Sequence, residues 1–180
     1  MSSLAPTSLR LRRATAADAA RLATLAATTF HDTFAADNDP ADMAAYAAAA
    51  FGEAQQRAEL LDADVTVLFA ERERGIAGYA MLREGAAPAC VAERDALEVA
   101  RLYAVRAAIG TGVGAALMRA CVDEAHARGR RALWLGVWER NARAIAFYER
   151  AGFRDCGAQP FLLGRDRQTD RVMVRPMEVA

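Results

Sequence analysis

Residues 102–114 constrain the fold of this 180-residue chain most, because they join an apolar strand to a helix through a glycine-rich turn. Gly110, Gly112 and Gly114 permit backbone conformations that a side chain would block, and they bring successive N–H groups close together. The first amides of the following helix, expected over residues 112–128, have no partner within the helix and carry the positive end of its dipole. The pattern therefore predicts a site for an anion such as a phosphate.

Three kinds of phosphate site use a turn of this type. A P-loop requires a lysine, whereas all 23 basic residues of this chain are arginines. A dinucleotide fingerprint fits the spacing of Gly110, Gly112 and Ala115, but that motif closes the first strand of its unit and is followed about 20 residues later by a carboxylate. Here the turn lies past mid-chain, and Arg130 and Arg131 precede the next expected strand. The third kind is a coenzyme A diphosphate site, which the downstream sequence favours.

A second motif follows the glycine turn. Residues 131–138 form a short apolar run bounded by charge, which is typical of a strand buried on both faces. Asn141 and Gly152 are suited to begin and end the next helix as N-cap and C′ residue. Together the two motifs resemble the GNAT superfamily of N-acetyltransferases, whose acetyl-CoA loop reads Gln/Arg-x-x-Gly-x-Gly/Ala and whose next helix carries Asn-x-x-Ala-x-x-Phe-Tyr-x-x-x-Gly-Phe. In this chain the helix motif consists of Asn141, Ala144, Phe147, Tyr148, Gly152 and Phe153.

The resemblance covers residues 97–153 strongly, and it is specific because two motifs agree in order and spacing. One position departs from the family pattern, since Ile109 stands where Gln or Arg is usual. The loop amides can still wrap a diphosphate, and Arg106 is the nearest basic substitute.

The resemblance implies that acetyl-CoA binds along the strand and the glycine loop. The strand would part from its neighbour and leave free amides for the pantetheine arm and the acetyl oxygen. Each assignment has an alternative. The strand is then an ordinary central strand, and Asn141 only caps its helix. The residues expected to bind the cosubstrate are Leu102, Tyr103, Ala104, Val105, Ile109, Gly110, Thr111, Gly112, Val113, Gly114, Asn141 and Tyr148.

Acetyl transfer to an amine requires a neutral nucleophile, a polarised thioester and a proton for the departing thiolate. The family places a tyrosine at the point of Tyr148, which is therefore the expected general acid; the alternative is a core tyrosine. Glu98 is the expected general base, because a carboxylate in an apolar strand is costly unless it is paired or titrates upward. Its alternative is an ion pair, for which Arg101 is available only if the strand bulges. Glu139 is the reserve base.

In the family, the connection between the first two helices borders the acceptor groove. That region of this chain also looks like the polyamine acetyltransferases of the spermidine/spermine type. An acidic mouth for a cationic substrate could include Asp32, Asp37, Asp39 and Asp42. Asp39 and Asp42 equally suit the start of the next helix. The expected substrate-binding residues are His31, Asp32, Trp138 and Glu139.

The predicted fold is α/β, with a mixed, mostly antiparallel central sheet and helices on both faces in the order β-α-α-β-β-β-α-β-α-β-β, as the GNAT resemblance implies. We expect residues 1–8 to be a flexible N-terminus and residues 9–180 to form a single acetyltransferase domain. The expected strands cover 9–13, 65–71, 76–83, 97–105 and 131–138, followed by a hairpin of 161–163 and 172–174 with a charged tip at 164–170. The expected helices cover about 15–28, a segment from Asp39, 53–61, 112–128 and 141–152. A long loop at 85–95 is a candidate flap.

Composition restricts the partners. Arg and Asp+Glu balance at 23 each, so no broad positive field predicts nucleic-acid binding. His31 and His126 do not cluster with other metal ligands, and no metal is expected. The three cysteines have no CxxC spacing and suit reduced thiols in a cytoplasmic protein. No apolar run reaches the length of a membrane span.

The sequence therefore predicts an enzyme that moves an acetyl group from acetyl-CoA to a small-molecule primary amine, with a polyamine as the first acceptor. A homodimer is possible, although no exposed apolar stripe establishes one. Two alternatives remain: a non-catalytic acyl-CoA-binding regulatory module, and a nicotinamide-dependent oxidoreductase that uses the glycine turn.

Overall fold

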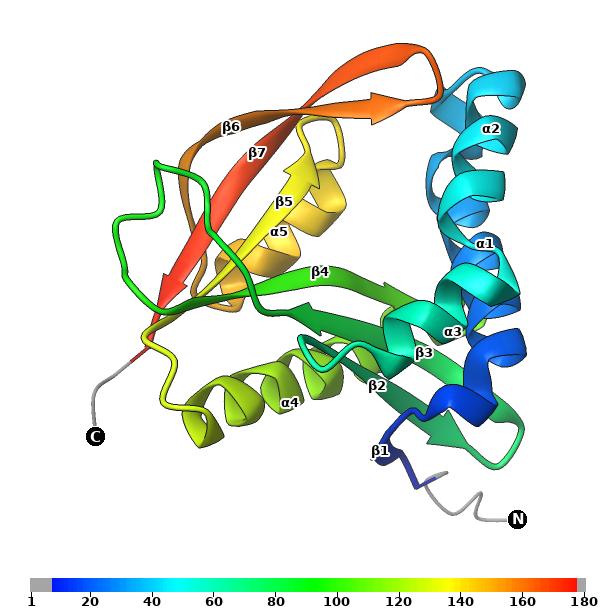
Figure 1. Cartoon of the computed structure of the whole chain (residues 1–180), viewed down its shortest axis with the longest axis horizontal. Helices are drawn as coiled ribbons and strands as arrows, with labels where there is room; N and C mark the ends of the chain where they lie inside the picture. Colours follow the sequence, from blue (N-terminus) through cyan, green and yellow to red (C-terminus); the bar gives the residue numbers. More distant parts are fainter. Residues whose placement is uncertain (1–7, 178–180) are drawn as a thin grey trace, which may run out of the picture.

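The computed structural model describes residues 8–177 of the chain (Figure 1). The flexible segment predicted at 1–8 lies, apart from residue 8, outside the described residues. The helices and strands are β1 (Arg10–Arg13), α1 (Ala19–Phe34), α2 (Pro40–Ala50), α3 (Glu53–Leu61), β2 (Val65–Arg72), β3 (Gly75–Arg83), β4 (Ala96–Ala104), α4 (Val113–Ala127), β5 (Ala132–Trp138), α5 (Ala142–Arg150), β6 (Arg154–Leu163) and β7 (Asp166–Pro176).

The strands form one seven-stranded sheet in the order β1-β2-β3-β4-β5-β7-β6. The pair β4–β5 is parallel, and the other neighbouring pairs are antiparallel. A parallel pair needs a crossover, and α4 supplies it between β4 and β5. The mostly antiparallel mixed sheet predicted from the sequence is confirmed.

Side-chain alternation along the strands separates two main cores. On β2, Leu68 and Ala70 belong to the cluster that α4 and α5 cover, whereas Val67 and Phe69 belong to the cluster that α1 and α2 cover. Figure 1 shows α1, α2 and α3 along one side of the molecule and α4 beneath β2, β3 and β4. Helices therefore lie on both faces of the sheet, as expected.

The region between β1 and β2 contains three helices, where the predicted order counted two; the separate helices expected from Asp39 and at 53–61 are both present. α2 ends at Ala50, whose carbonyl accepts a hydrogen bond from the buried Gln56 side chain at 2.8 Å. Gly52 then has an extended backbone and begins α3 as its N-cap. A buried glutamine thus satisfies one helix end where the chain turns into the next helix.

The first helix is longer than predicted, since α1 continues to Phe34 and not to about residue 28. Two threonines within it turn their hydroxyls back onto the helix, because Thr29 donates to the Leu25 carbonyl at 2.8 Å and Thr33 donates to the Thr29 carbonyl at 2.7 Å. His31 and Asp32 consequently lie in α1, and their expected position in a connection is wrong.

The last hairpin also differs from the prediction. Its turn is confined to Gly164 and Arg165, with φ +58° at the glycine, and β7 begins at Asp166. Most of the segment expected to be a charged tip is therefore strand. As a consequence Asp170 lies opposite Trp138 of β5 inside the sheet.

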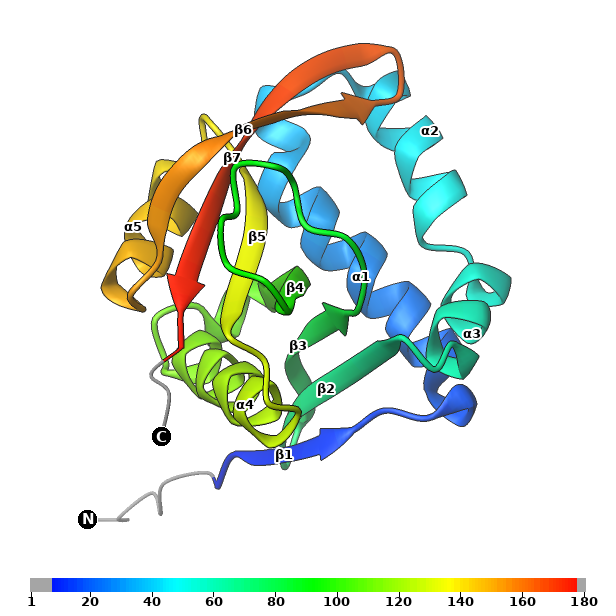
Figure 2. The same ribbon diagram turned by 60° about the vertical axis from the view of Figure 1, so that its left-hand side comes forward.

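The long loop before β4 packs against the sheet. Val91 belongs to a small buried cluster with Trp134 of β5 and Val172 of β7. Figure 2 shows the loop lying over this part of the sheet, on the side of α1 and α2. The loop contributes no residue to the cavity described below.

Among residues 8–177, no helix combines the length and hydropathy that a membrane span requires.

Candidate active site

The two parallel strands at the centre of the sheet part soon after they meet. β4 and β5 pair only from Ala96 with Ala132 to Glu98 with Trp134. Beyond Glu98 the facing edges of the two strands carry main-chain groups that belong to no shared ladder. The splayed strand that the resemblance implied is present in the structure.

Only half of the amides expected to be free on β4 face the gap. The amide of Val105 donates to the carbonyl of Ala77 at 2.9 Å, which places it on the β3 side. Because backbone groups alternate along a strand, Tyr103 also points to β3, while Leu102 and Ala104 point to the gap. The expectation of a free amide at Val105 is corrected by this hydrogen bond.

A cavity of about 210 Å³ passes through the gap between β4 and β5. Its lining combines Tyr148, Leu102 and Val137 from the α4/α5 side of the sheet with aromatic residues from the α1/α2 side. A molecule bound on one face can thus meet a molecule bound on the other. The lining residues are Phe30, Thr33, Phe34, Asn38, Tyr46, Phe51, Val99, Ala100, Arg101, Leu102, Tyr103, Ala104, Ile109, Gly136, Val137, Trp138, Asn141, Arg143, Ala144, Tyr148, Phe161, Leu163, Gln168 and Asp170.

The glycine turn leads from β4 to α4 and leaves several amides open. Gly110 and Gly112 have φ of +78° and +87°, conformations that favour glycine, and a Cβ at either position would meet nothing within 4 Å. Within the described chain, no main-chain or side-chain acceptor engages the amides of Gly112, Val113 or Gly114. The open space and the row of donors at a helix start suit an anionic group such as a diphosphate.

Two arginines approach this turn from other elements. Arg72 at the end of β2 donates to the Thr111 hydroxyl at 3.0 Å and to its carbonyl at 3.2 Å. Arg106, the substitute considered for Ile109, is largely exposed and lies 3.5 Å from a carboxylate oxygen of Asp32. Ile109 is itself 42% exposed and contributes its side chain to the cavity wall.

Tyr148 and Asn141 lie on α5 where it borders the cavity. Asn141 accepts a hydrogen bond from the Ala144 amide at 3.1 Å, so its expected role as N-cap is confirmed. Tyr148 is 9% exposed, and burial is the main cause that raises the pKa of its phenol above the ordinary value. The phenol is therefore protonated at neutral pH and can donate a hydrogen bond or a proton.

Glu98 has both of the properties between which the sequence could not decide, a raised pKa and an ion pair. The strand bulges at Ala100, where the pairing with β3 shifts between Met81 and Leu82, so Arg101 shares a face with Glu98. The ion-pair partner is nevertheless Arg83, whose Nη1 lies 3.7 Å from Glu98 Oε2. Burial raises the pKa of Glu98, and Arg83 and Arg101 oppose that shift. Glu98 does not line the cavity.

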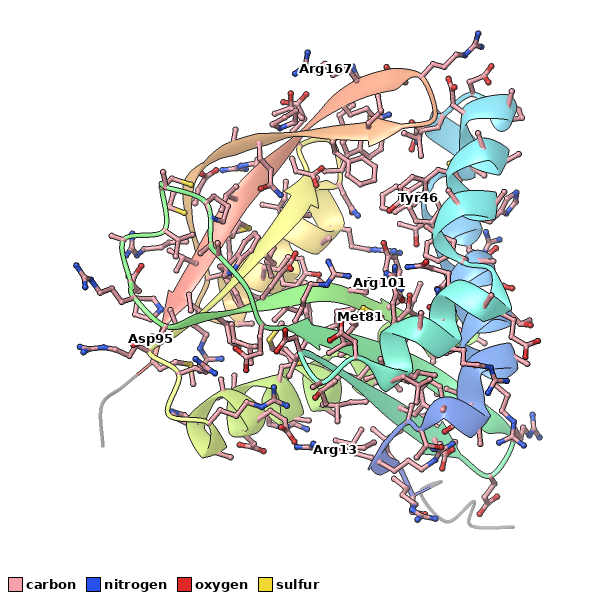
Figure 3. All side chains as sticks on the ribbon, in the orientation of Figure 1. Arg13, Tyr46, Met81, Asp95, Arg101 and Arg167 are labelled. Atoms are coloured by element: carbon pink, nitrogen blue, oxygen red, sulfur yellow. The ribbon has the colours of Figure 1, made fainter. Side chains whose placement is uncertain are left out.

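Arg101 is held by α3. Its guanidinium bonds both carboxylate oxygens of Glu59, at 2.9 and 3.1 Å, and the Gln56 side-chain oxygen at 3.1 Å. Figure 3 shows Arg101 above β4, and Tyr46 projecting from α2 toward the β6–β7 hairpin. Arg101 therefore forms one wall of the cavity with its charge already balanced by Glu59.

Asp170 is a cavity residue that the sequence reasoning missed. Its pKa is raised to about 6, and burial is the cause. Gly136 makes room for it, because a Cβ there would lie 3.1 Å from Asp170 Oδ2 and 2.8 Å from Gln159 Nε2. The sequence did contain a signal for this residue. Asp170 stands two positions before Val172, so the two side chains lie on the same face of an apolar strand.

Of the four residues expected to bind the acceptor substrate, one lines the cavity and three do not. Trp138 lines the cavity and packs edge-on against Phe34 with ring centroids 5.9 Å apart. His31, Asp32 and Glu139 are exposed and lie outside the lining.

The proposed acidic mouth does not assemble as a group. Asp39 caps α2 by accepting from the amides of Ala41 and Asp42, at 2.8 and 3.1 Å, as its alternative role predicted. The Asp42 carboxylate accepts from the Arg165 amide at 2.8 Å. Within residues 8–177, no group of three or more His, Cys, Asp or Glu side chains could hold a metal ion.

Comparison with known proteins agrees with this geometry. Residues 26–153 match the model of the acetyltransferase (GNAT) family. An uncharacterised N-acetyltransferase of Mycobacterium tuberculosis is 36% identical over 160 residues, which cover 89% of this chain and 98% of the relative. A similar protein of Lactobacillus delbrueckii subsp. lactis is 31% identical over 149 residues, covering 83% and 86% of the two chains.

A solved structure shares the fold. The PaiA N-acetyltransferase of Thermoplasma acidophilum, crystallised with coenzyme A, superposes with a TM-score of 0.78 over 94% of this chain and 99% of that chain, at 17% identity. The chain belongs to the acetyltransferase (GNAT) family. It is an acetyl-CoA-dependent N-acetyltransferase.

Proposed function

We propose that this enzyme transfers the acetyl group of acetyl-CoA directly to a primary amine of a small molecule, without a covalent enzyme intermediate. The cavity through the parted strands carries this proposal, because it joins Tyr148 on one side to an aromatic wall on the other, and Ile109, the residue before Gly110 of the glycine turn, lines it. Its volume of about 210 Å³ is below the roughly 300–1,000 Å³ of drug-sized sites, which supports a small acceptor.

In this proposal the acetyl-CoA diphosphate binds the glycine turn. The amides of Gly112, Val113 and Gly114 donate to its oxygens, and the dipole of α4 adds a favourable potential. Gly110, Thr111 and Ile109 shape the same turn. The amides of Leu102 and Ala104 face the pantetheine arm, and one of them polarises the thioester carbonyl.

Tyr148 is the proposed general acid. It borders the cavity and keeps its proton at neutral pH because burial disfavours the phenolate. A hydrogen bond from its hydroxyl would stabilise the departing thiolate of coenzyme A. Asn141 fixes the start of the helix that presents this tyrosine.

The amine must lose a proton before it attacks. Glu98 can act as this base only through water, since it lies outside the cavity lining and close to Arg83. A polyamine is one acceptor of the proposed class, and the protein is expected to act in the cytoplasm.

The experiment is incubation of the purified protein with acetyl-CoA and a panel of primary amines, with free thiol and acetylated amine measured together. Production of both in equal amounts supports the proposal. Coenzyme A binding without turnover on any amine would instead favour a non-catalytic acyl-CoA-binding module. Thermal stabilisation by NADP and not by coenzyme A would favour the oxidoreductase alternative.

A further inference from the structure

We propose that the acceptor carries a single ammonium group on an apolar or aromatic body, and that Asp170 binds this ammonium and accepts its proton. The inference rests on the proposed function and concerns the part of the same cavity on the α1/α2 side of the sheet. We call this part, lined by Phe30, Phe34, Tyr46, Trp138, Phe161 and Asp170, the acceptor half.

Negative charge in the acceptor half is confined to one carboxylate. Among the described residues that line the cavity, Asp170 is the only acidic one. It forms no ion pair with any described arginine or histidine, and burial accounts for its raised pKa. A half-buried carboxylate without a cationic partner attracts a cation from solution.

The cationic residues of the lining do not fill this role. Arg101 is 13% exposed at its side chain and is engaged by Glu59 in a two-oxygen ion pair. Arg143 lies exposed near the start of α5, which belongs to the opposite face of the sheet from Asp170. The charge that Asp170 lacks must therefore come from the ligand.

The rest of the acceptor half is aromatic. Phe30 stacks on Tyr46 with ring centroids 4.9 Å apart, and Tyr46 packs against Phe161 at 5.3 Å. Phe34 and Trp138 continue this wall. Aromatic faces favour apolar groups and attract an ammonium through their negative π surface. One carboxylate surrounded by aromatic rings suits an amine attached to an apolar body.

A polyamine fits this chemistry less well. Each further ammonium would need a partner, because burying an unpaired charge is costly. Asp42 and Asp32, which could extend the acidic surface, are engaged by the Arg165 amide and by Arg106. The aromatic wall itself supplies no second carboxylate.

Protons and electron pairs move as follows during acetyl transfer. The ammonium gives one proton to the Asp170 carboxylate and becomes a neutral amine. Its nitrogen lone pair forms a bond to the thioester carbon, the carbon–sulfur bond breaks, and the sulfur takes the proton of Tyr148. The new amide nitrogen releases its extra proton, which restores Tyr148, and Asp170 returns its proton to solvent. The products are the N-acetyl amine and coenzyme A as a free thiol.

The test compares binding and turnover at pH 7.5. Calorimetry on the coenzyme A complex would measure the affinity of 2-phenylethylamine and of its neutral analogue 2-phenylethanol. We expect the wild type to bind the amine at least tenfold more tightly than the alcohol, and the D170N variant to bind the two about equally. Retained binding of the alcohol shows that the variant is folded. D123N, an exposed change of the same charge on α4, should keep the wild-type ratio.

Turnover supplies the second measurement. We expect kcat/KM for 2-phenylethylamine to exceed that for spermidine at least tenfold. A higher kcat/KM for spermidine, or an amine-to-alcohol ratio that D170N leaves unchanged, would overturn the inference while acetyl transfer itself stands. If coenzyme A binds and no amine is acetylated, both the inference and the proposed function fail.

Discussion

The D170N substitution should remove the acidic limb of the pH profile of kcat/KM. The pKa of Asp170 is raised from 3.8 to about 6, because the carboxylate is buried beside Gly136 and the cavity. A base must be ionised to accept a proton, so the wild-type rate should be constant at pH 7–8 and fall as the pH drops through about 6. At pH 5 only about one tenth of a group with this pKa is ionised, and we expect a roughly tenfold loss relative to pH 7.5.

In D170N the limb near pH 6 should vanish, and kcat/KM at pH 7.5 should fall about 100-fold, at the lower end of the range for general-base catalysis. The assay is initial-rate release of free thiol between pH 5 and 9 in a buffer of constant ionic strength. E98Q and D123N provide the comparison. If E98Q removes the limb and D170N retains it, Glu98 is the base and the reasoning from cavity position is refuted.

Three further predictions concern the other parts of the site and the fold. Y148F should lower kcat about 100-fold at unchanged coenzyme A affinity, because the thiolate loses its proton donor; an unchanged kcat in the thiol-release assay would assign Tyr148 to packing alone. G112A should weaken coenzyme A binding at least tenfold by calorimetry, since φ is +87° and the new methyl group would enter the open space above the loop. The control is G129A, where φ is +64° just beyond the other end of α4 and the surroundings are equally open. G129A should lower the stability by a similar amount and leave the affinity for coenzyme A unchanged. D18N should lower the free energy of unfolding by about 2 kcal/mol at pH 7, because the hydrogen-bonded ion pair with Arg12 holds the pKa of Asp18 at about 2. A depressed folded-state pKa stabilises the protein above the unfolded value and loses this effect as the pH falls toward 2, so denaturation should show a difference at pH 7 that shrinks in acid; an equal difference at both pH values would contradict the assignment.

Local sequence signals predicted much of the fold. Asn141 and Gly152 marked both ends of α5, and the glycine turn marked the start of α4, because caps and positive φ angles are set by single residues. The separate helices α2 and α3 were also expected, from Asp39 and at 53–61. No local pattern showed how the break between them is stabilised. It depends on Gln56, whose side chain bonds a carbonyl of the preceding helix.

The acceptor half of the site could not be predicted from local sequence signals. Asp170 gains its raised pKa from burial in a cavity that residues of α1, α2, β4, β5, α5, β6 and β7 enclose together, and its strand was mistaken for a turn because polar residues surround it. Glu98 stood out as a carboxylate in an apolar strand, yet its partner Arg83 lies on a neighbouring strand that only the sheet register identifies. Sequence patterns therefore located the cosubstrate side, whereas tertiary packing defines the acceptor side.

The central claim is that the amides at the start of α4 bind the diphosphate of acetyl-CoA, and isothermal calorimetry with coenzyme A tests it most directly. We expect saturable binding at a one-to-one ratio that weakens at least tenfold in G112A and is unchanged in G129A. Absence of heat up to millimolar coenzyme A, or equal affinity in all three proteins, would contradict it.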